Sequence, residues 1–139
     1  MVEYHCKGTL DEATLPDWME GRLAAFKNFL SATGFRLLRS EHREYHPQYN
    51  YAGTFDLEGV LEHLPGRPAA LIDVKRTLGG APAVGVQLAG YQMMLKEPRL
   101  RFGLELKDSG SYRLQKFDSP NDAGVFLACL TIQRWKDSQ

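Results

Sequence analysis

The sequence has no long hydrophobic run: none of its apolar stretches reaches the length that a membrane-spanning helix needs. Its first residues do not follow the pattern of a secretory signal peptide, and the chain contains neither an internal repeat nor a low-complexity segment. These absences predict a protein that stays in the cytoplasm and has no membrane partner.

The sequence also has few cysteines and no excess of charge of either sign. Cys6 and Cys129 lie far apart without metal-like spacing, which suits reduced thiols in a cytoplasm. The 17 lysines and arginines are balanced by 17 aspartates and glutamates, so the net charge is 0. A bulk electrostatic binder of nucleic acid is therefore disfavoured, and any such partner must be held by local basic patches.

The 139 residues, 43% of them hydrophobic, suffice for a single domain over 1–139, in which 1–15 are poorly assigned. Apolar periodicity and turn residues predict the order helix, three strands, helix, two strands, helix. The expected ranges are 16–33 for the first helix, 35–45, 51–61 and 69–75 for strands, 83–95 for a helix, 101–106 and 112–117 for strands, and 119–122 for the start of the last helix. This order is typical of an α/β (α+β-like) fold with a central mixed sheet flanked by helices.

The last helix is predicted as a packing element. Ser119 is expected to cap it, with Pro120 at the first helical position. Trp135 is expected to pack against the rest of the protein, and Cys129 to be a small core residue beside the packed face.

The turn dipeptide Pro65-Gly66 separates two β-rich segments and predicts an antiparallel hairpin. If the strands pair symmetrically about this turn, Asp56 lies opposite Lys75 and Glu58 lies opposite Asp73. Side chains alternate between the two faces of a strand, so Asp73 and Lys75 share one face. The hairpin thus gathers carboxylates and one ammonium group at one end of two mostly apolar strands.

Carboxylates that lie close together repel one another and lose solvation, so they need a compensating cation. A divalent metal is the obvious candidate, and hard oxygen ligands favour Mg²⁺ or Mn²⁺ over zinc. Asp56 and Asp73 are the predicted ligands, with Lys75 beside them. The alternative for Asp73 and Lys75 is an ion pair at an exposed strand end, which adds little to stability.

Three short motifs follow one another along the chain: Gly53-Thr54-Phe55-Asp56, Ile72-Asp73-Val74-Lys75 and Gln87-Leu88-Ala89-Gly90-Tyr91. This set resembles the PD-(D/E)XK nuclease superfamily and within it the RecB-like and phage exonuclease branch, where a GxxD strand, a DxK strand and a QxxxY helix occur in this order. The resemblance spans about residues 20 to 135. It implies a restriction-endonuclease-like core and a metal-dependent deoxyribonuclease, an exonuclease in preference to an endonuclease. Such an enzyme would act in recombination, repair or phage DNA processing, in a bacterium or a phage-infected host.

The resemblance also implies roles for individual residues. Asp56 and Asp73 would hold Mg²⁺ or Mn²⁺, with the backbone carbonyl of Val74 as a further ligand. The metal would lower the pKa of a bound water, which Lys75 would position or deprotonate.

Gln87 and Tyr91 are neighbours on one helix face and, by the same resemblance, would brace Lys75 or contact the DNA strand. The alternative is a packed Tyr91 beside an exposed Gln87.

Four further residues are weaker candidates. Glu20, on the first helix, or Glu41, on the first strand, is a candidate metal ligand; the alternatives are an ordinary first-turn carboxylate and a solvated edge strand. Arg76 begins a glycine-containing loop, and the N–H donors of its guanidinium group match the geometry of a phosphate. Arg43 is a second candidate for phosphate contact.

Relatives of the nuclease branch often carry a Gly-x-x-x-His pattern on a helix that leads into the fold, and this pattern is missing here. Either the chain begins after that helix or another residue substitutes. Its absence and the zero net charge favour an alternative, a non-catalytic nucleic-acid-binding or assembly subunit that keeps the nuclease scaffold. An RNA- or nucleotide-directed hydrolase would use the same residues. DNA is the expected partner, and a homo-oligomer is a candidate state.

Overall fold

The computed structural model describes residues 2, 8, 16–79 and 82–139; the poorly assigned N-terminal positions, Cys6 among them, lie almost entirely outside this part. Its elements match the predicted order. In chain order they are α2 (Asp17–Thr33), β1 (Phe35–His46), β2 (Tyr51–Leu61), β3 (Ala69–Lys75), α3 (Pro82–Met93), β4 (Leu100–Leu106), β5 (Tyr112–Lys116) and α4 (Asp122–Asp137).

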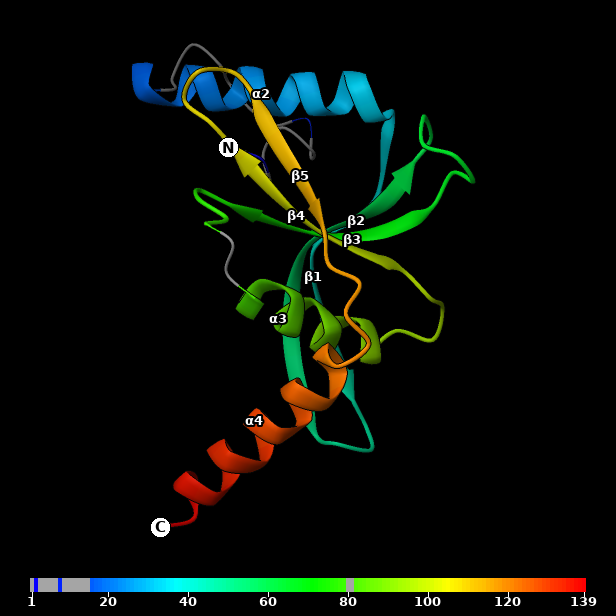
Figure 1. The fold of residues 1–139 in the computed structure, drawn as a ribbon, viewed down its shortest axis with the longest axis vertical. Helices are drawn as coiled ribbons and strands as arrows, with labels where there is room; N and C mark the ends of the chain where they lie inside the picture. The colour runs from blue at the N-terminus through cyan, green and yellow to red at the C-terminus, as the bar shows by residue number, and fades with distance from the viewer. Residues whose placement is uncertain (1, 3–7, 9–15, 80–81) are drawn as a thin grey trace.

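The five strands form one sheet in the order β1-β2-β3-β4-β5. β3 and β4 are parallel and are joined through α3, whereas the other neighbouring strands are antiparallel, so the sheet is mixed. α2 packs on one face of this sheet and α3 on the other, while α4 packs on α3 (Figure 1). The predicted α/β class, with a central mixed sheet flanked by helices, is confirmed.

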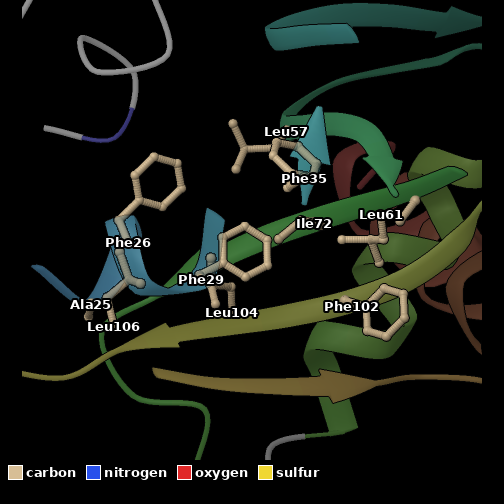
Figure 2. Close-up of a cluster of buried hydrophobic side chains, with 11 residues drawn as sticks. Ala25, Phe26, Phe29, Phe35, Leu57, Leu61, Ile72, Phe102, Leu104 and Leu106 are labelled. Atoms are coloured by element: carbon tan, nitrogen blue, oxygen red, sulfur yellow. The ribbon is translucent and has the colours of Figure 1, made fainter. Parts of the chain in front are cut away.

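Each face of the sheet has its own hydrophobic core. On the α2 face, aromatic residues of the helix meet branched residues of the strands (Figure 2). The central members of this cluster are Phe26, Phe29, Leu57, Ile72 and Leu104. On the α3 face a smaller cluster consists of Phe55, Leu71, Leu78, Val84 and Leu88. Asp73 interrupts the same face of β3 as Leu71 of this second cluster, and it is buried.

The register of the β2–β3 hairpin differs from the prediction by two residues. Leu57 pairs with Ile72 in the last pair of this ladder, so Asp56 and Asp73 flank that pair and Asp56 is not paired with Lys75. Among the paired residues of this hairpin, a shift of two leaves each side chain on its predicted face, because strand side chains alternate with a period of two. The correction therefore brings the two predicted metal ligands closer together.

The connection between β2 and β3 explains the shift. The predicted turn does form, with the Arg67 N–H donating to the Leu64 carbonyl at 3.0 Å. However, Glu62 and His63 do not pair with β3, because their N–H groups donate to the carbonyls of the α2–β1 connection at 3.4 and 2.9 Å. The ladder starts only where the Leu61 N–H meets the carbonyl of Pro68, at 2.9 Å.

The start and the environment of α4 also differ from the prediction. The helix begins at Asp122 with Asn121 at its N-cap, and Ser119 instead forms the preceding turn, its hydroxyl accepting the Asn121 N–H at 3.3 Å. Cys129 is exposed, and Trp135 is 63% exposed, so neither is a core residue. None of the residues of α4, which is described in full, is buried.

Candidate metal and catalytic site

The five predicted catalytic residues come together on the α3 face of the sheet. The Lys75 Nζ atom lies 3.2 Å from Asp73 Oδ2, and Gln87 Nε2 donates to the Tyr91 hydroxyl at 2.7 Å. Burial raises the pKa of Tyr91, the hydrogen bond from Gln87 opposes this, and the charges of Asp73 and Asp56 raise it further. Tyr91 therefore lies within electrostatic reach of both carboxylates, and β2, β3 and α3 each supply part of one site.

Asp73 is the most strongly perturbed member of this group. It is 5% exposed, and its Oδ2 atom finds no hydrogen-bond partner among the described residues; Lys75 approaches it only as an ion pair. Burial raises the pKa of Asp73 to about 6, and the neighbouring Asp56 carboxyl adds to this, while Lys75 opposes it. Two carboxylates thus share a space in which one negative charge is poorly compensated.

A local irregularity in β2 directs the Asp56 side chain toward β3. Phe55 belongs to the core under α3 whereas Leu57 belongs to the core under α2, so the normal alternation is broken at Asp56. The Asp56 Oδ2 atom accepts the backbone N–H of Val74 at 2.8 Å. Such irregularities in strands commonly lie next to functional sites, where they redirect a side chain.

Gly53, the glycine of the first motif, makes room for Tyr91. A Cβ atom at this position would lie 2.8 Å from the Tyr91 ring and 3.4 Å from the Met94 methyl group. Two residues earlier, the Tyr51 hydroxyl donates to the Gly90 carbonyl at 2.6 Å and ties β2 to α3. The first and third motifs are therefore in direct contact.

The weaker candidates are placed less favourably. Glu20 lies on α2, which covers the opposite face of the sheet, and Glu41 is exposed on β1 with φ 47°. Within residues 2, 8, 16–79 and 82–139, no three His, Cys, Asp or Glu side chains form a group that could hold a metal. Neither glutamate thus completes such a group with the aspartates. Arg76 directly follows β3 and Arg43 lies on β1, both with exposed side chains.

A buried ion network beside the site was not predicted. Glu58, expected opposite Asp73, instead pairs with Leu71 and is 2% exposed. It accepts hydrogen bonds from Arg39 Nε at 2.6 Å and from Arg99 Nε at 3.0 Å. Burial raises the pKa of Glu58, but these two guanidinium groups outweigh burial and hold it below the ordinary value. The interruption of an apolar strand by Glu58 was the only sequence signal, because Arg99 is distant in the chain.

The loop that follows Lys75 is tied to the next strand. Glu105 lies beside Lys75 in the parallel β3–β4 register, and its Oε2 atom accepts the Leu78 N–H at 2.9 Å. Leu78 is buried in the core under α3. This bond ties the first residues of the loop to β4.

None of the helices in the described part of the chain is long and apolar enough to cross a membrane. The sequence matches no protein-family model, and no curated protein matches it. The geometry of these residues is therefore the basis for assigning a function.

Proposed function

We propose that this protein is a Mg²⁺- or Mn²⁺-dependent deoxyribonuclease of the PD-(D/E)XK kind, acting as an exonuclease on DNA. The observation that carries the proposal is the buried Asp73 Oδ2 atom, which no described donor satisfies, beside the Asp56 carboxyl and 3.2 Å from Lys75 Nζ. The resemblance carried by the three motifs supports the proposal, because their residues meet on one face of the sheet.

The donor set fits a hard divalent cation. The buried Asp73 Oδ2 atom has only the ion pair with Lys75 to compensate its charge, and a cation bound between Asp56 and Asp73 would lower the cost of burying it. The N–H and C=O of one strand residue point to the same side, so the Val74 carbonyl is expected to face Asp56, as its N–H does at 2.8 Å. Oxygen ligands of this kind favour Mg²⁺ or Mn²⁺. When bound, such a cation supplies a Lewis acid that acidifies water and neutralises charge on a phosphoryl oxygen.

The protein's own side chains would orient the reactants. The Lys75 side chain, 38% exposed, is open enough to reach a phosphate or an attacking water while still paired with Asp73. Its ammonium group would position the water and offset the negative charge of the transition state. Tyr91, fixed by Gln87 and packed over Gly53, would keep Lys75 and the carboxylates in place. Arg76 and Arg43 would contact the DNA backbone.

Incubation with linear duplex, circular duplex and single-stranded DNA, with and without Mn²⁺, tests this proposal. Linear DNA should be degraded only when the metal is present. Asp73→Ala and Lys75→Ala should each lower the rate by at least about 100-fold with the circular dichroism spectrum unchanged. Asp118→Ala, at an exposed position, is the matched control. Parental rates in the Asp73→Ala or Lys75→Ala variant would refute the assignment.

The non-catalytic alternative has one observation in its favour, since the described residues supply no third metal-ligating side chain next to Asp56 and Asp73. A subunit of that kind would shift DNA in a native gel but would neither bind Mn²⁺ nor cleave. Cleavage by the parental protein that is lost in Asp73→Ala excludes this alternative.

A further inference from the structure

The chain that leaves β3 returns to the core at its third residue. Arg76 and Thr77 are exposed, but Leu78 is 1% exposed and belongs to the hydrophobic cluster under α3. Gly79, which follows, is exposed and has a φ of 54°, a conformation that other residues adopt only at a cost. The segment therefore inserts one apolar side chain into the core between exposed residues.

Leu78 fills the place beside Asp73 that a neighbouring side chain would otherwise take. In the parallel β3–β4 pair, Asp73 is level with Gly103. Paired residues of adjacent strands lie about 4.8 Å apart and project their side chains on the same face, but Gly103 has no side chain. A Cβ atom built on Gly103 would lie 2.6 Å from Leu78 Cδ2 and 3.4 Å from Leu78 Cδ1. The leucine methyl groups therefore cover the β4 side of Asp73, which is only 5% exposed.

Glu105 stabilises Leu78 in this position. It lies two residues after Gly103 on β4, so the two positions are on the same face of the sheet. Its Oε2 atom accepts the Leu78 N–H at 2.9 Å, and hydrogen bonds to an ionised acceptor are stronger than neutral ones. Without this acceptor the N–H of a buried residue would be left unsatisfied, which opposes the insertion of the leucine.

We propose that Glu105 is a positioning residue of the candidate site, which acts through Leu78 to keep water away from Asp73. Beside an apolar side chain, fewer water molecules compete with a divalent cation for the carboxylate, and the attraction between cation and carboxylate is stronger than in water. The effect of Glu105 on the metal rests on the proposed function, whereas the insertion of Leu78 does not.

The other role open to Glu105 is an electrostatic one. Glu105 is level with Lys75 in the β3–β4 register, so its charge would stabilise the ammonium group. The contacts favour the positioning role, because Glu105 bonds to Leu78 while Lys75 lies 3.2 Å from Asp73. Two substitutions separate these roles. Glu105→Met removes both the charge and the hydrogen-bond acceptor, whereas Glu105→Gln removes only the charge.

Hydrogen exchange followed by NMR tests the insertion of Leu78 without metal or DNA. The Leu78 amide of the parental protein should exchange at least about 100-fold more slowly than in an unstructured peptide. This protection should fall at least about tenfold in Glu105→Met, beyond any change at Phe29 in the other core, and Glu105→Gln should recover it. An unprotected Leu78 amide in the parental protein, or undiminished protection in Glu105→Met, overturns the proposal.

Two measurements with Mn²⁺ test the effect on the metal site. By calorimetry, Mn²⁺ affinity should fall at least about tenfold in Glu105→Met and in Leu78→Ala, and Glu105→Gln should recover it. The relaxation rate of water protons per bound Mn²⁺ should rise in the first two variants, because more water reaches the metal. A general loss of structure would not produce this rise together with unchanged circular dichroism spectra.

The outcomes separate this proposal from the proposed function. Equal Mn²⁺ affinity in all variants, or equally weakened affinity in Glu105→Met and Glu105→Gln, overturns the positioning role and leaves the metal site standing. Absence of Mn²⁺ binding by the parental protein refutes the proposed function, and the exchange rates of Leu78 then decide the positioning role by themselves.

Discussion

Removing the charge of Asp73 should stabilise the folded protein while it abolishes the proposed activity. The change is Asp73→Asn, which keeps the size of the side chain and supplies an amide N–H that the Asp56 carboxylate can accept. In the folded chain, burial first and the Asp56 carboxyl second raise the pKa of Asp73 from 3.8 to about 6. The ionised form is therefore less favourable in the folded than in the unfolded chain.

The magnitude follows from this difference in pKa. The folded state holds the proton more tightly, so the free energy of unfolding falls as the pH rises from 3.8 to about 6 and is then constant. The full difference corresponds to roughly 3 kcal/mol. This difference is already net of the attraction of Lys75, which lowers the pKa of Asp73. Asn is uncharged, as the protonated carboxyl is, so the expected gain at neutral pH is roughly 3 kcal/mol.

Urea unfolding followed by circular dichroism, with chelator present, measures this gain. Asp73→Asn should be more stable than the parental protein at about pH 7.5, and the difference should approach zero at about pH 4. Added Mn²⁺ should stabilise only the parental protein and shrink the difference. Asp118→Asn, at an exposed position, is the control and should change little. A destabilised Asp73→Asn variant, or an equal gain at both pH values, would refute the reasoning.

Three further predictions concern neighbouring residues. Glu58→Gln leaves two guanidinium groups without their carboxylate and should lower the free energy of unfolding by about 3 kcal/mol near neutral pH; in urea titrations this loss should disappear as the pH falls below 4.5 through the lowered pKa of Glu58. Gly53→Ala puts a methyl group 2.8 Å from the Tyr91 ring, so the rate of cleavage should drop about tenfold and the thermal stability should fall. A variant as active as the parental protein would show that the Tyr91 ring can move aside without affecting the site. Lys75→Met should abolish cleavage yet keep Mn²⁺ affinity within about threefold by calorimetry, because Lys75 is not a ligand; loss of Mn²⁺ binding contradicts this role.

Much of the fold follows from local sequence signals. Apolar periodicity and turn residues predicted the eight described elements that run from Asp17 to Asp137, and strand alternation correctly placed Asp73 and Lys75 on one face. The hairpin register could not be predicted, because it depends on Glu62 and His63 donating to the α2–β1 connection. These hydrogen bonds join the end of β2 to the end of α2, and α2 lies outside the hairpin sequence.

The candidate site was predicted only where its residues form local motifs. Glu58 carried no motif, and its partner Arg99 is brought close by the pairing of β4 with β3. On α4, periodicity identified apolar positions but not what covers them. Cys129 and Trp135 are therefore exposed although their spacing resembles that of core residues. Tertiary pairing, and not propensity, decides both cases.

Titration calorimetry with Mn²⁺ tests the central claim most directly. The claim is that Asp56 and Asp73, from adjacent strands, bind one divalent cation together. The parental protein should bind Mn²⁺, and both Asp56→Asn and Asp73→Asn should lose that binding while remaining folded. Absence of binding by the parental protein, or undiminished binding by either variant, would contradict the claim.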